Sequence, residues 1–317
     1  MQQFFRQKLP AACFRHLCPP LSLHYSQSYA TLNSFVQSIK IDRNKPMDNT
    51  IKDINFQQLW ENARSKRSWS NKEAKDWDKK ASSFARRNIN APFAQMIMQR
   101  LPLQNSDTVL DVGSGPGTLS LPIAEKVSQV TAIDYSGKML DILADQADKR
   151  GLTNISAVQA SWTDDWAEKC IIAHDIGIAS RSLNVLDLRG AISKLNDFSR
   201  KFVFLADRIN PTPFDPEIFK AVGRSFEPGP DYIYTINILY EMQIHPQVEI
   251  LELDRELTFT GYEQALESLK WMIEALTPDE ESLLRKYLDE KGRVKPDGTL
   301  TIERSHPLRW ALIWWKK

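Results

Sequence analysis

The sequence has little cysteine and little histidine, with 3 and 5 of them in 317 residues. An odd cysteine count, widely spaced beyond Cys13 and Cys18, argues against a disulfide framework. That pair has no companion pair to complete a zinc site, and His174, His245 and His306 lack the spacing of metal ligands. We therefore expect a reducing compartment, no disulfides and no metal site.

Long apolar runs and an excess of charge are also absent. No stretch approaches the roughly 18 consecutive apolar residues that a transmembrane helix needs. The 41 basic and 40 acidic residues leave a net charge of +1, whereas nucleic-acid-binding domains usually carry a basic excess. We expect no membrane span, and we disfavour a nucleic-acid partner, although a local basic cleft would revive it.

Acidic residues are missing from residues 1–41, where Arg, Lys, Ser and Gln are present instead. Such a composition is typical of an organelle transit peptide. Alternatively, Met47 is the true start and the preceding segment is an extension. We expect residues 1–46 to be disordered or transit-like and residues 47–317 to form the domain. We favour a start at Met47, which predicts a cytoplasmic protein, whereas a transit peptide predicts a mitochondrial or other organellar one.

Apolar residues follow helical spacing over residues 55–100, which predicts an N-terminal helical cap. From Thr108 onward, strands and helices alternate, which predicts βαβ units. We therefore expect a doubly wound, Rossmann-like and mostly parallel sheet, with its core in residues 105–207. The predicted strands are 108–112, 129–133, 155–159, 175–179 and 201–206, and the predicted helices between them are 119–127, 137–150 and 187–198.

The alternation ends after Asp207, where several prolines mark an insertion before the last strand. Residues 208–317 are the expected substrate side. Helices are predicted at 231–242, 262–275 and 278–288, one strand at 248–259 and a last strand at 309–315.

A glycine-rich loop follows the first predicted strand and contains Gly113, Gly115 and Gly117. Alternate glycines let the backbone turn sharply and approach a ligand closely, and the next helix presents free N–H groups. A dinucleotide site would need the third glycine one position later, where Thr118 stands. Asp134 ends the second predicted strand and suits ribose hydroxyls, because a carboxylate accepts two hydrogen bonds from a vicinal diol.

These residues resemble a known family. Asp111, the three glycines and Asp134 resemble motif I and the acidic residue of class I S-adenosylmethionine-dependent methyltransferases. The stretch from Trp77 to Phe84 resembles the lead-in helix of the small-molecule enzymes related to ubiquinone and menaquinone biosynthesis. The resemblance covers about residues 75–207. It implies a methyltransferase with S-adenosylmethionine as its cofactor.

The resemblance also implies roles for individual residues. The glycines would line the methionine part of the cofactor, and Asp111 would brace the loop. Asp134 would bind the ribose hydroxyls, and Tyr135 would lie against the adenine. Ser161 and Trp162 would follow the adenine edge, and Ser180 would begin the segment that faces the methyl group. The implied cofactor-binding set is Asp111, Gly113, Ser114, Gly115, Gly117, Asp134, Tyr135, Ser161, Trp162 and Ser180.

Several of these residues have a simpler interpretation. Trp162 could be an ordinary packed aromatic residue. Arg181 could form a salt bridge rather than contact the substrate. Trp77 and Phe84 lie seven residues apart on a predicted helix, which is more often core packing than a substrate lid. Arg181, Trp77 and Phe84 are the candidate substrate residues, and the sequence indicates no catalytic residue.

Three functions remain open from the sequence. The first and favoured is transfer of a methyl group to a small-molecule acceptor by in-line displacement, for which the protein mainly supplies alignment. The second is methylation of RNA or protein, and the third is a non-catalytic scaffold. An enclosed apolar cavity beside the cofactor would favour the first, an open basic groove the second, and a filled cofactor cleft the third. The sequence predicts neither the acceptor nor the oligomeric state.

Overall fold

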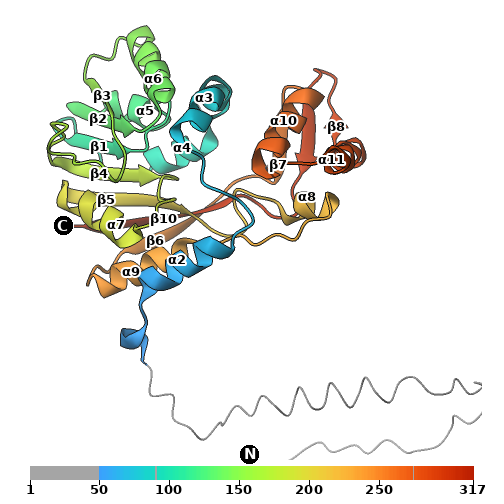
Figure 1. Cartoon of the computed structure of the whole chain (residues 1–317). Coiled ribbons are helices and arrows are strands. Elements are labelled where there is room, and N and C mark those ends of the chain that lie inside the picture. The colour runs from blue at the N-terminus through green and yellow to red at the C-terminus, as the bar shows by residue number, and fades with distance from the viewer. Residues whose placement is uncertain (1–49, 90, 274) are drawn as a thin grey trace, which may run out of the picture. The chain divides into compact units, whose positions relative to one another are not determined.

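Seven of the strands form one sheet with the order β3-β2-β1-β4-β5-β10-β6 (Figure 1). Strands β1 to β5 pair in parallel, and β10 is antiparallel to both β5 and β6. The mostly parallel, Rossmann-like sheet predicted from the alternation is therefore confirmed. The strands are β1 (Thr108–Val112), β2 (Gln129–Asp134), β3 (Ile155–Gln159), β4 (His174–Ser180), β5 (Ser199–Arg208), β6 (Gln247–Glu252) and β10 (Arg309–Lys316).

The structure is a computed structural model that describes residues 50–89, 91–273 and 275–317. Residues from Lys52 to Lys317 form one unit. The expected transit-like segment, residues 1–46, lies outside the described residues. A short 3-10 helix, η1 (Ile51–Asp53), begins the described part.

Helices cover both faces of the sheet because successive strand residues point to opposite faces. Leu110 packs with α2, α7 and α9 on one face, and Val109 packs with α4 and α5 on the other. Helix α3 packs on α6. The helices are α2 (Phe56–Lys66), α3 (Ala74–Asn88), α4 (Pro92–Met98), α5 (Ser120–Ala124), α6 (Gly137–Lys149), α7 (Leu188–Asp197) and α9 (Tyr232–Glu241).

Local signals place several helix starts where the sequence predicts them. The Ser136 side chain accepts a hydrogen bond from the Met139 amide at the start of α6. The Asp187 side chain accepts one from the Gly190 amide at the start of α7. Such caps satisfy backbone N–H groups that the first turn of a helix leaves unpaired.

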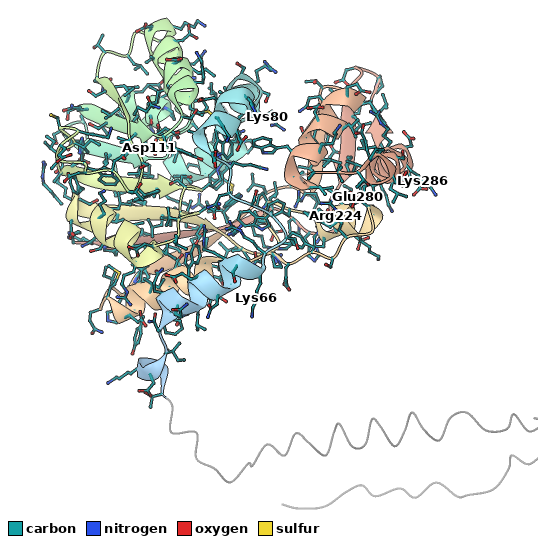
Figure 2. The ribbon with its side chains drawn as sticks, in the orientation of Figure 1. Lys66, Lys80, Asp111, Arg224, Glu280 and Lys286 are labelled. Carbon is teal, nitrogen blue, oxygen red and sulfur yellow. The ribbon has the colours of Figure 1, made fainter. Side chains whose placement is uncertain are left out.

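Between β6 and β10 the chain builds a second, three-stranded sheet with the order β7-β9-β8. Helices α8, α10 and α11 pack on it around a separate core. Arg224 and Glu280 lie side by side there, joined by hydrogen bonds of 2.6 and 2.7 Å (Figure 2). The elements are α8 (Pro216–Ala221), β7 (Glu256–Phe259), α10 (Tyr262–Ile273), α11 (Pro278–Lys291), β8 (Arg293–Val294) and β9 (Leu300–Glu303).

The prediction of one strand over residues 248–259 is wrong. Strand β6 ends at Glu252 and pairs with β10, whereas β7 begins at Glu256 and pairs with β9 in the other sheet. Both strands have partners far away in the sequence. Periodicity does not report which sheet a strand joins, so the two strands looked like one.

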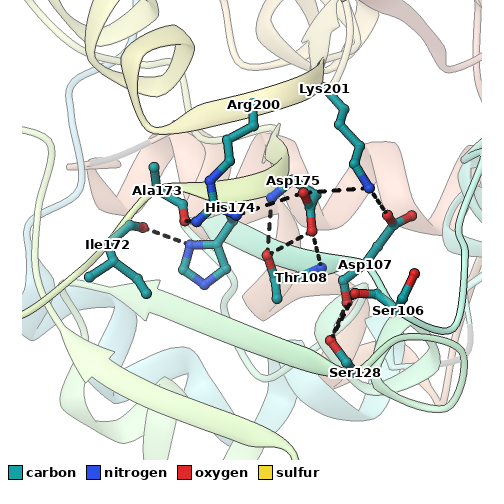
Figure 3. A network of polar contacts seen from close by, with 10 residues as sticks. All are labelled: Ser106, Asp107, Thr108, Ser128, Ile172, Ala173, His174, Asp175, Arg200 and Lys201. Atoms are coloured by element: carbon teal, nitrogen blue, oxygen red, sulfur yellow. Dashed lines mark hydrogen bonds and ion pairs between the residues drawn. The ribbon is translucent and has the colours of Figure 1, made fainter.

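A polar network joins the amino ends of β1, β4 and β5 (Figure 3). The Asp175 carboxylate accepts hydrogen bonds from the Thr108 amide at 3.0 Å and the Thr108 hydroxyl at 3.2 Å. The Lys201 amine donates to the buried Asp107 carboxylate at 2.6 Å. In open α/β sheets, ligands bind at the opposite, carboxyl edge, where the glycine loop lies.

Candidate functional site

The glycine loop connects β1 to α5, and its three glycines have φ values of +72°, +55° and +87°. A Cβ on Gly113 would lie 2.3 Å from the Cβ of Ser182, and one on Gly117 would lie 2.9 Å from the Leu121 side chain. These two glycines are therefore needed for packing as well as for the turn. A Cβ on Gly115 would meet only the Phe84 ring, at 3.9 Å. The open space of the loop is therefore beside Gly115.

Asp134 holds this loop at the carboxyl end of β2. Its Oδ2 accepts a hydrogen bond from the Gly115 amide at 2.9 Å, and its Oδ1 accepts one from the Ser136 amide at 2.9 Å. Burial raises the pKa of the Asp134 carboxyl, and these backbone hydrogen bonds oppose that rise. Asp134 is buried, with 7% of the residue exposed.

Asp111 braces the other side of the loop. Its Oδ2 accepts a hydrogen bond from the Ser120 hydroxyl at 2.6 Å, which ties β1 to α5. The pKa of the Asp111 carboxyl is raised to about 6, chiefly by burial and also by the nearby charge of Asp134, while the Ser120 hydrogen bonds oppose the rise. The carboxyl groups of Asp134 and Asp111 therefore lie on both sides of the loop.

The Ser114 hydroxyl is buried and has no hydrogen-bond partner among the described residues. An unsatisfied buried polar group costs about 1–3 kcal/mol, so such groups in native proteins usually await a ligand or water. This hydroxyl lies between Gly113 and Gly115 in the loop. The loop therefore fits a ligand with polar groups, such as the amino-acid end of S-adenosylmethionine.

Helix α3 packs on α6 and contacts the residues that follow β2. The Asp78 carboxylate accepts hydrogen bonds from the Ser136 hydroxyl at 2.6 Å and the Lys138 amide at 3.2 Å. The Tyr135 hydroxyl donates to the Lys72 carbonyl just before α3, at 3.1 Å. Our sequence-based site lacked Asp78. Asp78 lies three residues before the buried Ala81 on the same face of α3, and this helical spacing could have indicated it from the sequence.

The segment after β3 contacts the segment after β4 through the Trp162 side chain. The Trp162 indole N–H donates to the Ser182 carbonyl at 3.0 Å, and its ring packs on Trp166 with 5.5 Å between centroids. The Ser161 amide donates to the Asp164 carboxylate at 2.9 Å. Trp162 thus packs against the core and also contacts the segment after β4, as expected of an ordinary packed aromatic residue, and its contact with adenine stays a prediction.

Ser180 ends β4, and Arg181 follows it in a left-handed conformation with φ of +58°. The carbon at the centre of the Arg181 guanidinium lies 4.7 Å from the centroid of the Phe93 ring, 5.6 Å from that of Trp310 and 6.0 Å from that of Phe84. Its two terminal nitrogens donate to the Asn88 amide oxygen at 3.4 and 3.3 Å. Burial lowers the pKa of Arg181 to about 10.

Trp77 and Phe84 contact each other edge to face, with 5.4 Å between ring centroids. Trp77 also contacts Trp271 of α10 at 5.9 Å. Both side chains are only partly buried, so they line the surface of α3 and do not lie deep in the core. The contact with α10 joins the N-terminal helices to the chain between β6 and β10.

Among residues 50–89, 91–273 and 275–317, no group of three or more His, Cys, Asp or Glu side chains is placed to hold a metal ion. No helix in this described part is long and apolar enough to cross a membrane.

Residues 109–200 match the family described as methyltransferase domain. An uncharacterized protein of Haemophilus influenzae is 35% identical over 270 residues, which are 84% of this chain and 98% of that protein. The chain therefore belongs to the same family as that protein. A 23S rRNA (uracil(1939)-C(5))-methyltransferase of Aliivibrio fischeri is 32% identical over 83 residues, only 26% of this chain and 19% of that enzyme.

Among solved structures, the chain is similar to the YcgJ protein of Bacillus subtilis. The TM-score is 0.49 with 14% identity, over 71% of this chain and 97% of that one. The matched family covers the sheet from β1 to the start of β5, which includes the glycine loop, Asp134 and the ends of β3 and β4. The chain is thus a class I methyltransferase that uses S-adenosylmethionine.

Proposed function

We propose that this enzyme transfers the methyl group of S-adenosylmethionine to a small-molecule acceptor by in-line displacement. The observation that carries the proposal is the aromatic surrounding of the segment after β4. The Phe84 ring lies next to Gly115 of the loop and next to the Arg181 guanidinium, and it contacts the Trp77 ring. Aromatic rings beside the loop suit a compact acceptor better than a polynucleotide, which needs an extended basic groove.

For the cofactor we assign the residues on the loop side. Asp134 would bind the ribose hydroxyls, because a carboxylate offers about four acceptor positions and the backbone amides of Gly115, Tyr135 and Ser136 do not take all of them. The Ser114 hydroxyl would bind the amino-acid end of the cofactor beside Gly115. We assign Tyr135, Ser161 and Trp162 to the adenine side, and Ser180 to the methyl side.

The bound cofactor supplies an electrophilic methyl group, so the chain's own residues have to align the acceptor and exclude water. We assign the acceptor side to the N-terminal helices, above all α3, and to the region after Asp207. The contact between Trp77 and Trp271 joins these two parts. No side chain is assigned as a general base, since a base is needed only if the acceptor must lose a proton.

Two measurements test this function in sequence. Calorimetric titration should show binding of S-adenosylmethionine and S-adenosylhomocysteine, and no binding of NAD. Release of S-adenosylhomocysteine is then followed with small aromatic acids, phenols and amines in one arm, and with bulk tRNA, rRNA or protein in the other. Turnover in the first arm supports the proposal. Turnover in the second arm alone would replace it by methylation of a macromolecule.

A further inference from the structure

The guanidinium of Arg181 has no acidic partner among the residues that the structure describes. None of the ion pairs formed between described residues includes Arg181. Its polar contact is with the neutral amide oxygen of Asn88, at 3.3 and 3.4 Å. Arg224, by contrast, binds both oxygens of Glu280 at 2.6 and 2.7 Å.

The backbone holds Arg181 in an uncommon conformation. A φ of +58° in a residue other than glycine costs about 1–3 kcal/mol and is concentrated at functional sites. The Arg181 amide donates to the Ala206 carbonyl of β5 at 2.8 Å, and the Ser182 hydroxyl donates to the Val112 carbonyl of β1 at 2.6 Å. The neighbouring strands thus hold this conformation, and with it the position of the side chain.

The rings around the guanidinium determine what could bind there. Phe93 and Trp310 are buried, whereas Phe84 and Arg181 are partly accessible, so a ligand can approach from the Phe84 side. Phe84 is also the residue nearest to the open side of Gly115. A ligand that contacts both Phe84 and Arg181 would therefore lie next to the cofactor loop. Apolar walls lower the local dielectric and strengthen an ion pair formed within them.

We propose that the methyl acceptor carries an oxyanion, either a carboxylate or a phosphate, on an aromatic or otherwise apolar body. We propose also that Arg181 binds this oxyanion. The inference rests on the proposed small-molecule methyl transfer and names the class of acceptor. The planar guanidinium offers two parallel N–H donors to the oxyanion, in place of the Asn88 amide oxygen. The apolar body lies on the Phe84 ring, between Arg181 and the loop.

The test uses the full chain saturated with S-adenosylhomocysteine and three probes, which are benzoate, phenyl phosphate and the neutral benzamide. Calorimetry should show binding of benzoate or phenyl phosphate and none of benzamide. Preference for benzoate assigns a carboxylate acceptor, and preference for phenyl phosphate assigns a phosphate. Binding of benzamide as tight as that of both anions would overturn the proposal, because recognition would then not involve charge.

Variants locate the binding group. In Arg181→Gln, anion affinity should fall roughly tenfold or more, whereas affinity for S-adenosylhomocysteine stays within about twofold. Arg181→Lys keeps the charge and should retain part of the phenyl phosphate affinity but lose more for benzoate, which needs the bidentate donor. Arg86→Gln removes an exposed arginine of α3, the helix that carries Phe84, and should leave both the anion affinity and the S-adenosylhomocysteine affinity unchanged.

The outcomes separate this inference from the function on which it rests. If the wild-type chain binds neither S-adenosylmethionine nor S-adenosylhomocysteine, the proposed function fails. If it binds them but binds no anion, or if Arg181→Gln and Arg181→Lys bind the anions as the wild type does, methyl transfer stands and the role of Arg181 is rejected. If Arg181→Gln does not fold, the lysine variant alone decides.

Discussion

Oδ2 of Asp134 accepts a hydrogen bond of 2.9 Å from the amide of Gly115. The carboxylate at the end of β2 therefore holds the loop that follows β1. This bond gives Asp134 two tasks, because the same group is assigned to the ribose hydroxyls of the cofactor. Loss of the side chain should affect cofactor binding directly and also through the shape of the loop.

We expect Asp134→Ala to weaken S-adenosylmethionine binding by about 1–3 kcal/mol, the size of a lost hydrogen bond to a charged group. Calorimetric titration measures this change. Asp141→Ala is the matched control, since Asp141 is an exposed acid on α6 that pairs with Lys138. An Asp134→Ala protein that is folded and binds the cofactor with wild-type affinity would remove Asp134 from the site.

Two glycines of the loop should respond differently to alanine. Gly115→Ala meets no close neighbour, so its unfolding free energy should fall by only about 1–2 kcal/mol from the left-handed backbone. Gly113→Ala adds a clash with Ser182 and should lose about 1–3 kcal/mol more. Chemical denaturation compares the two variants.

Cofactor affinity provides the second comparison between these glycine variants. The Gly115→Ala protein should be folded and yet bind S-adenosylmethionine roughly tenfold more weakly, because its methyl group occupies the open side of the loop. Normal affinity in this variant would show that the cofactor does not approach Gly115.

Stability should depend on pH through Asp111. Its pKa is about 6 in the folded chain, against 3.8 for an ordinary aspartate, so the folded state binds the proton more tightly. The contribution of this group is greatest below pH 3.8 and is lost as the pH rises through 6, by about 3 kcal/mol. Relative to wild type, Asp111→Asn should therefore gain unfolding free energy between pH 4 and 7. A constant difference across that range would contradict the assignment.

A substitution at the amino edge of the sheet should change the stability of the protein but not its cofactor affinity. Asp107 is buried, accepts hydrogen bonds from the Gln104 amide and the Lys201 amine, and lies in the network of Figure 3. Asp107→Ala should lower the unfolding free energy by about 1–3 kcal/mol and leave the cofactor affinity of the folded protein unchanged. A large drop in affinity would mean that this edge controls the geometry of the loop.

The sequence predicted features that depend on neighbouring residues. The glycine loop, the caps at Ser136 and Asp187 and the strand alternation are all of this kind. Contacts between segments that are far apart in the chain could not be predicted from the sequence. The rings around Arg181 come from α3, α4 and β10, and Asp78 reaches Ser136 across 58 positions. The division of residues 248–259 between two sheets likewise depends on partners far along the chain.

The chain leaves the main sheet after β6 and returns to it at β10 through adjacent residues. The Leu253 amide donates to the Leu308 carbonyl at 2.9 Å, and the Arg309 guanidinium donates to the Glu252 carboxylate at 2.7 Å. Because these ends already meet, the entropy of closing the intervening chain changes only slowly with its length. The length of the chain between positions 253 and 308 can therefore change without shifting the register of β6 against β10, provided that its core with α8 is kept.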